Sequence, residues 1–209
     1  MAKLNTLQDF LLESLKDLYS AEKQITKALP KMIKAASSEE LREAFETHLQ
    51  QTEEQINRLD KISKTLGKSL SGKKCSAMEG LLQEGKEIME ADCTPEVMDV
   101  ALISAAQKVE HYEIAGYGCV VTYAQLLGNN KIKDLLSETL DEESEADKKL
   151  TEIAEEINPQ AMQNNEENEG EEDNENNEDD NEDNRNKRDD KNKKDDRDKE
   201  QKTKKNEKM

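Results

Sequence analysis

The chain has no tryptophan, only two phenylalanines, three cysteines and no long apolar run. No segment approaches the ~20 consecutive apolar residues that a membrane-spanning helix needs, so we expect no membrane insertion. Cys75, Cys93 and Cys119 are an odd number in no metal-ligand spacing, which favours free thiols in a reducing compartment. The N-terminus, MAKLNTLQDF, lacks the basic and then apolar pattern of a signal peptide. We therefore expect a cytoplasmic protein.

The average composition, with 33% hydrophobic and 38% charged residues, hides two unlike parts. Residues 1–157 hold nearly all the apolar side chains, whereas residues 158–209 are almost entirely Asn, Asp, Glu and Lys. The second part has no hydrophobic periodicity, so burial cannot offset the entropy lost on ordering it. We predict a folded domain over 1–157 and a disordered tail over 158–209, whose partner the sequence leaves unknown.

The folded part is acidic in its own right. Residues 158–209 carry 19 acidic and 12 basic residues, which leaves 30 and 19 for residues 1–157. An acidic surface repels the phosphates of nucleic acids and anionic lipids, so neither is expected as the main partner. Such a surface is compatible with cations.

Hydrophobic periodicity predicts four long amphipathic helices in an all-α domain. They are expected over residues 4–36, 39–66, 95–127 and 131–157. Residues 67–95, with a short helix at 77–91, are too long for a hairpin turn and are interpreted as a crossover connection. The predicted fold is a ferritin-like antiparallel four-helix bundle with a crossover helix.

A carboxylate interrupts the apolar stripe in the middle of three of these helices. On the third helix the stripe passes from Val109 to Tyr117 through Glu113. Glu22 interrupts the first helix in the same way, and Glu143 the fourth. Burying an unpaired carboxylate costs at least several kcal/mol. Either the helical register differs from the predicted one, or a cation lies inside the bundle.

An internal repeat aligns these interruptions. Shifting the chain by 91 residues places Glu22 on Glu113 and Thr52 on Glu143, and it superposes apolar positions of the stripes as well. The correspondence indicates two similar helical hairpins joined by the crossover.

In that topology the polar interruptions form layers across the bundle. The central layer takes one residue from each helix: Glu22, Thr52, Glu113 and Glu143. The adjacent layer holds His48, Glu110 and Asp147. Five carboxylates and one imidazole then converge, and no inward Lys or Arg is expected among them. Two divalent cations would nearly balance this charge, whereas one would not.

Each candidate also has an ordinary structural interpretation. Slightly rotated helices would leave the glutamates solvated, as most glutamates are. Glu110 could be a supporting or surface residue, and His48 a core histidine satisfied by Thr52 or by a carboxylate. Asp147 could pair with a surface lysine. His111, two residues before Glu113, is expected to point away from the bundle axis.

Residues 4–157 resemble the YciF-like family of bacterial stress-associated ferritin-like proteins. The segments that carry the resemblance are DLYSAEKQ (17–24), HLQQTEEQINRL (48–59), KCSAMEGL (74–81), AAQKVEHYEIAGYG (105–118) and ETLDEESEADKKL (138–150). The resemblance implies an antiparallel bundle, a homodimer and a dinuclear iron-type centre. Its metal ligands would be Glu22, His48, Glu110, Glu113, Glu143 and Asp147.

The sequence departs from the common di-iron pattern, which has Glu-x-x-His on two helices. The second helix offers His48 and Thr52, and the fourth offers Glu143 and Asp147 without a histidine. Iron is the expected metal, and the oxygen-rich ligand set also suits Mn(II). We hypothesise a stress-associated protein with a dinuclear metal centre that reacts with oxygen or peroxide. The alternative is a non-enzymatic helical stress or interaction protein with a vestigial polar core and a charged tail that binds partners.

Overall fold

The computed structural model describes residues 4–162, which form five helices and no strand. The first four are α1 (Leu7–Ala35), α2 (Glu39–Leu66), α3 (Ser76–Met89) and α4 (Pro95–Leu126). The last helix is described over residues 130–162. Within this part of the chain no helix is long and apolar enough to cross a membrane.

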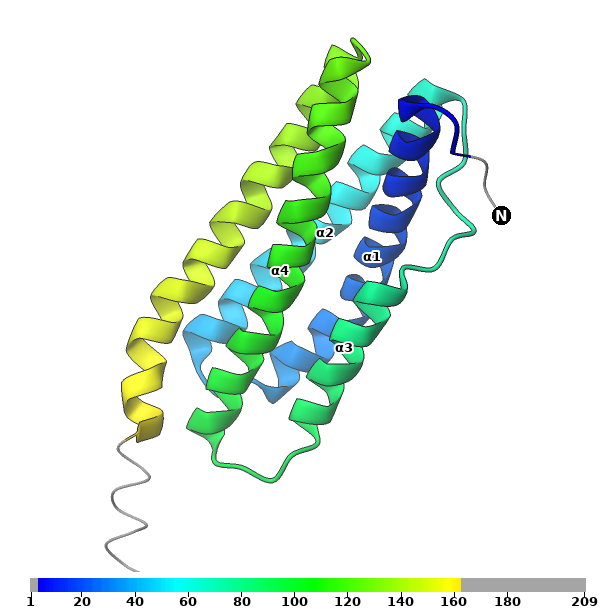
Figure 1. Ribbon diagram of the computed structural model, residues 1–209. Coiled ribbons are helices and arrows are strands. Elements are labelled where there is room, and N and C mark those ends of the chain that lie inside the picture. Colours follow the sequence, from blue (N-terminus) through cyan, green and yellow to red (C-terminus); the bar gives the residue numbers. More distant parts are fainter. Residues whose placement is uncertain (1–3, 163–209) are drawn as a thin grey trace, which may run out of the picture. The chain divides into compact units, whose positions relative to one another are not determined.

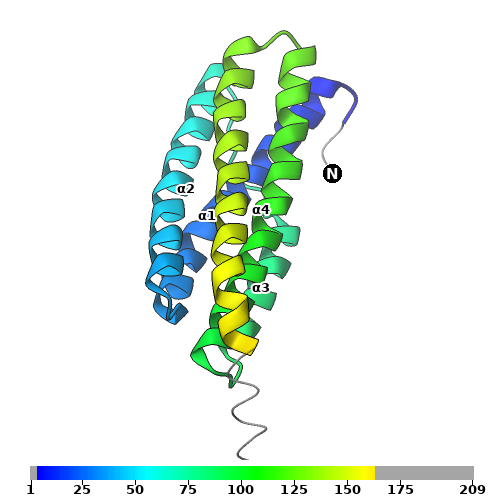
Figure 2. The same ribbon diagram turned by 90° about the vertical axis from the view of Figure 1, so that its left-hand side faces the viewer.

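The four long helices form the bundle, with α3 against α1 and α4 (Figures 1 and 2). In Figure 1, α1 and the last helix run downward, whereas α2 and α4 run upward. Two parallel helices in this arrangement need a long connection, which the crossover containing α3 supplies. The predicted all-α, ferritin-like topology is therefore confirmed.

The helix ends follow the expected capping chemistry. Thr6 and Asp9 form a capping box, so α1 begins at Leu7 rather than at the predicted residue 4. The Ser38 side chain caps α2, which ends where Gly67 adopts a left-handed conformation at φ 61°. Thr94 caps α4, and Pro95 occupies its first turn, where a missing N–H costs no hydrogen bond.

The last helix extends beyond its predicted end at Ile157. Residues 158–162 are helical, although they were assigned to the disordered tail. Pro159 removes the hydrogen bond to the carbonyl of Glu155, a residue that is exposed and can be hydrated. The predicted disorder of residues 163–209 lies outside the described residues, and the domain division at residue 157 stays a prediction.

The apolar core is divided into two clusters with polar residues between them. One cluster includes Ile25, Phe45 and Ile153, and the other includes Leu15, Leu59 and Leu136. Along α1, Glu22 lies between Leu18 of one cluster and Ile25 of the other, and it is fully buried. The fold thus places a polar layer at the middle of an otherwise apolar bundle.

Candidate metal centre

Five buried ionisable side chains from all four bundle helices meet at this polar layer. They are Glu22 on α1, His48 on α2, Glu110 and Glu113 on α4, and Glu143 on the last helix. Glu22, Glu113 and Glu143 are 0% exposed. The helical register predicted for these three glutamates is therefore correct, and the solvated alternative is wrong.

Four of the five residues approach one another closely enough to share an ion. His48, Glu110, Glu113 and Glu143 each offer one ligand atom, and these four atoms all lie within 4.8 Å of one another. His48 Nε2 lies 3.3 Å from Glu110 Oε1 and 3.9 Å from Glu143 Oε2. The shorter contact lacks hydrogen-bond geometry, since His48 Nε2 has no hydrogen-bond partner.

The cluster has almost no internal hydrogen bonding. Within the described residues, nine buried side-chain oxygen and nitrogen atoms have no hydrogen-bond partner. One is the amide oxygen of Gln55, and the other eight belong to Glu22, His48, Glu110, Glu113 and Glu143. Buried polar atoms in folded proteins are nearly always partnered, so eight unpartnered atoms in one place form a group that could hold a cation.

Burial shifts the pKa of every member toward its neutral form. Desolvation is the main cause that raises the pKa of Glu22, Glu110 and Glu113 well above 4.5, and the neighbouring carboxylates raise it further. Burial also raises the pKa of Glu143 to about 7 and lowers the pKa of His48 to about 4. Without a cation, the cluster therefore retains protons that ordinary glutamates release.

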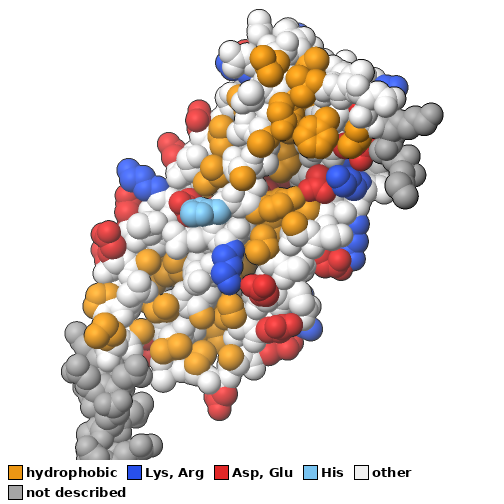
Figure 3. Space-filling model, in the orientation of Figure 1, with side chains coloured by type: hydrophobic (Ala, Val, Ile, Leu, Met, Phe, Trp, Pro, Cys, Tyr) orange, Lys and Arg blue, Asp and Glu red, His pale blue; other side chains and the backbone are white. Residues whose placement is uncertain are grey.

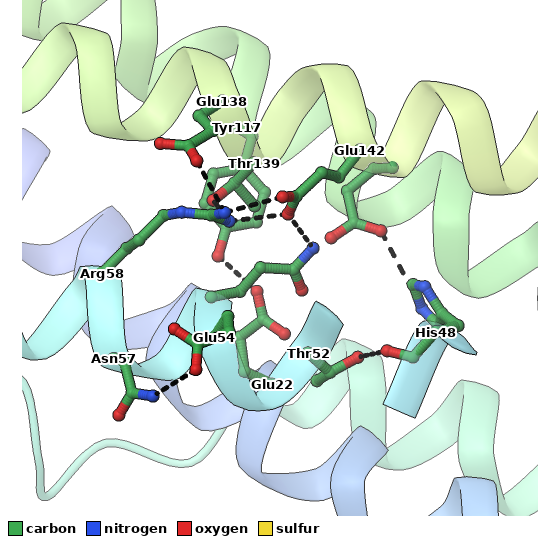
Figure 4. Close-up of polar contacts among 12 residues, drawn as sticks. Glu22, His48, Thr52, Glu54, Asn57, Arg58, Tyr117, Glu138, Thr139 and Glu142 are labelled. Carbon is green, nitrogen blue, oxygen red and sulfur yellow. Dashed lines mark hydrogen bonds and ion pairs between the residues drawn. The ribbon is translucent and has the colours of Figure 1, made fainter. Parts of the chain in front are cut away.

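Tyr117 on α4 positions the α1 carboxylate. Its hydroxyl donates a hydrogen bond to Glu22 Oε1, and its ring is fully buried (Figure 4). Burial and the nearby carboxylates raise the pKa of Tyr117 well above 10, so the hydroxyl keeps its proton. This contact leaves Glu22 Oε2 free to bind a cation.

Thr52 lies in the central layer, as predicted, and is fully buried. Its hydroxyl donates to the backbone carbonyl of His48 at 2.8 Å, so it does not satisfy the imidazole. Gln55, one turn away, donates from its amide to Glu142 at 3.1 Å. The interpretation of His48 as a histidine satisfied by Thr52 is therefore wrong.

Arg58 corrects the expectation that no basic side chain faces the cluster. Its guanidinium, 11% exposed, donates two hydrogen bonds of 2.6 Å to Glu142 and one of 2.9 Å to Glu138 (Figure 4). The positive charge of Arg58 also opposes the rise in the pKa of Glu22. Glu142 neutralises most of its charge, so Arg58 does not replace an internal cation.

Asp147 is the predicted ligand that the fold does not bring into the cluster. Its carboxylate lies 3.3 Å from His111 Nε2 and accepts a hydrogen bond of 3.2 Å from Gln107. A residue four positions after Glu143 is rotated by about 40° around the helix, which turns Asp147 toward the edge shared with α4. His111 is 69% exposed, in agreement with its predicted outward direction.

The residues present fit a pair of divalent cations. Four carboxylates supply four negative charges when ionised, and one imidazole adds a neutral nitrogen donor. Two divalent ions balance that charge, whereas a single ion leaves two carboxylates uncompensated in a buried site. Carboxylate oxygens with one imidazole suit iron and manganese.

The topology and the buried carboxylate layer define a ferritin-like four-helix-bundle protein. Residues 6–163 match the model of a family described as a domain of unknown function, DUF892. Protein YciF of Escherichia coli (strain K12) is 48% identical over 152 residues, which are 72% of this chain and 92% of that protein. The chain belongs to this YciF-like family.

Solved structures of relatives share the fold. The crystal structure of the E. coli stress protein YciF gives a TM-score of 0.72 at 47% identity, covering 74% of this chain and 98% of that one. YcfI of Rhodopseudomonas palustris gives 0.69 at 44% identity, covering 71% and 95%. A Xanthomonas campestris protein with 22% identity and a TM-score of 0.62, covering 77% and 98%, shows the fold alone.

Proposed function

We propose that this chain is a stress-associated cytoplasmic protein that binds two divalent metal ions, iron or manganese, and reacts with oxygen or peroxide. The observation that carries the proposal is the set of eight unpartnered buried atoms on Glu22, His48, Glu110, Glu113 and Glu143. The similarity to E. coli YciF, described as a stress protein, supports the association with stress. The three cysteines of this chain are free, which supports a reducing compartment.

Each of the five residues has a defined part in the proposed site. His48, Glu110, Glu113 and Glu143 supply the four mutually close ligand atoms. Glu22 joins them as the carboxylate that Tyr117 orients. Asp147 is left out, because Gln107 and His111 occupy its oxygens.

When bound, iron or manganese supplies the one-electron chemistry that carboxylate side chains lack. The chain contributes an environment with little water, since all five residues are at most 6% exposed. Tyr117 keeps a proton on its hydroxyl beside Glu22. Arg58 holds Glu142 away from the ligands by a bidentate ion pair.

Metal stoichiometry tests the proposal. Protein purified without chelator and then titrated anaerobically with Fe(II) is expected to hold two ions per chain and to change its optical spectrum on aeration. Glu113→Ala should bind metal at least ~10-fold more weakly, whereas Glu155→Ala, at an exposed residue of the last helix, should not. No bound metal and no optical change would refute the proposal.

A second candidate is a non-enzymatic structural protein. The relative YcfI is described as a candidate structural protein, which favours this alternative. Under this candidate the polar layer no longer binds metal, and Glu113→Ala should leave the metal content unchanged. The same titration therefore separates the two candidates.

We further propose that the chain forms a homodimer through the α1–α4 face. In Figure 3, hydrophobic side chains gather on the upper half of this face, where α3 does not cover it. Phe10 is 44% exposed with its ring 5.6 Å from Tyr123, and Leu126 is 71% exposed. Light scattering should give twice the chain mass of 23.8 kDa, and Leu126→Glu should weaken the dimer. Met162→Glu, at a residue that is 68% exposed on the last helix, is the matched control.

A further inference from the structure

A cavity of about 370 Å³ leads from the protein surface to the candidate metal centre. Its mouth lies between α2 and the last helix, and its walls come from all five described helices. Most of the wall is apolar, including Ile25, Leu29, Met32, Phe45, Val109 and Leu150. A volume of this size is within the range of small-molecule sites and far exceeds that of one water molecule.

The inner end of the cavity is polar. His48 and Glu110 line it, and they are 6% and 2% exposed. Both imidazole nitrogens of His48 and one oxygen of Glu110 have no hydrogen-bond partner. A molecule in the cavity would therefore have apolar walls along its length and polar groups at one end.

The mouth carries charges that select against anions. Glu40, Glu43 and Glu145 line it together with a single cation, Lys149. Lys149 forms a 2.5 Å ion pair with Glu40, so its charge is already engaged across the mouth. The two remaining carboxylates disfavour an entering carboxylate or phosphate.

We propose that this cavity binds a small uncharged apolar molecule, with its single polar group against His48 and Glu110. The inference deepens the proposed function and rests on it, because it names the substrate class of the candidate metal centre. A dry cavity of 150 Å³ accommodates the six carbons of benzene, so a cavity of this volume has room for roughly fifteen carbon atoms at most. A primary alcohol with an eight-carbon chain satisfies the size, the polarity gradient and the charge.

The first test compares 1-octanol with octanoate, which share a chain and differ in charge. Calorimetric titration of the metal-free full chain is expected to show one octanol molecule per chain, and octanoate bound at least ten times more weakly. Ala146→Leu, which fills the cavity wall, should reduce octanol affinity at least tenfold. The matched control is Ala154→Leu, a partly buried alanine of the same helix outside the cavity.

Equal or stronger octanoate binding would overturn the inference, as would octanol binding that survives Ala146→Leu. If Ala146→Leu lowers the helical content or the melting temperature, Ala44→Leu on α2 replaces it at the cavity wall. The octanol and octanoate comparison in the unmodified chain needs no variant and tests the charge preference by itself.

A second measurement separates this inference from the proposed function. In protein loaded with Mn(II), the proton signals of bound octanol should broaden most at the carbon that carries the hydroxyl. Octanol binding by protein that takes up neither Fe(II) nor Mn(II) would refute the proposed function and leave the cavity assignment standing. Mn(II) binding without octanol binding would refute the cavity assignment alone. Strongest broadening at the methyl end would overturn the proposed orientation.

Discussion

Glu113 is the residue at which function and stability conflict most directly. Both of its carboxylate oxygens are buried without partners, and burial together with Glu22 and Glu143 raises its pKa well above 4.5. In the metal-free protein, folding therefore makes this carboxyl group harder to ionise than it is in the unfolded chain. A carboxyl group buried in this way destabilises the metal-free fold.

We expect Glu113→Gln to raise the free energy of unfolding of the metal-free protein. The gain should be present at pH 7, because glutamine removes the cost of burying an ionisable carboxyl group beside Glu22 and Glu143. Urea denaturation after chelator treatment measures it. Glu145→Gln, at an exposed position, should change the free energy by less than about 0.5 kcal/mol. A destabilised Glu113→Gln protein would show that the carboxylates are not mutually repulsive.

Sequence periodicity could predict which glutamates of the site are buried. It could not predict which partners the long side chains around them would contact. Glu22, Glu113 and Glu143 interrupt apolar stripes at helical spacing, so their burial was predictable. Asp147 is one turn beyond Glu143, and the periodicity could not show that Gln107 and His111 would hold its carboxylate. The direction of a long side chain such as Arg58 depends on its partners, here Glu142 and Glu138 on another helix.

At the scale of elements, Asp99 on α4 fixes the turn between α1 and α2. Its side chain is 3% exposed and accepts hydrogen bonds of 2.8 Å from the backbone N–H groups of Ser37 and Ser38. The hydroxyl of Ser37 donates a third bond of 2.5 Å. One carboxylate thus connects the start of α4 to the start of α2, at the end of the bundle where the crossover enters.

We expect Asp99→Ala to destabilise the protein by about 2 kcal/mol or more, because it removes three hydrogen bonds to a charged carboxylate. Thermal unfolding followed by circular dichroism measures this loss. Glu96→Ala removes an acid from the first turn of α4, one turn before Asp99, without touching the α1–α2 turn, so its effect should stay below about 1 kcal/mol. Equal effects of the two substitutions would show that Asp99 acts only through the helix dipole.

Local chemistry predicts the element boundaries better than it predicts such connections. Ser38, Gly67, Thr94 and Pro95 mark their helix ends by residue type alone, and all four do so in the structure. The contact between Asp99 and Ser37 spans 62 positions of the chain. No local pattern predicts it, because it depends on how the two hairpins pack.

At the scale of the whole molecule, the 91-residue repeat relates two helical hairpins, and each hairpin contributes to both apolar clusters. Each hairpin contributes one fully buried carboxylate to the central layer: the first hairpin supplies Glu22 and the second supplies Glu113. The second hairpin adds Glu143 where the first has Thr52. The ligand set is therefore unequal within a nearly repeated fold, with three of the five candidate ligands on α4 and the last helix.

This concentration of buried acids predicts how the stability of the metal-free protein depends on pH. The pKa values of four glutamates are raised from 4.5, and that of Glu143 reaches about 7. Their contribution to stability is fully present below pH 4.5 and is lost as pH rises through the folded-state values. His48 has the opposite effect on the stability, because burial lowers its pKa from 6.5 to about 4. It is a single group, whereas the glutamates are four.

The free energy of unfolding of the metal-free protein should therefore fall between pH 5 and pH 7, with each retained proton contributing about 1.4 kcal/mol per pH unit. The double variant Glu110→Gln, Glu113→Gln should show a shallower fall, because two of these protons no longer titrate. Mn(II) displaces the same protons when it binds, so the stabilisation that saturating Mn(II) provides should grow with pH. Urea denaturation at several pH values, with and without Mn(II), measures both slopes. A stabilisation independent of pH would mean that the ion binds outside the glutamate cluster.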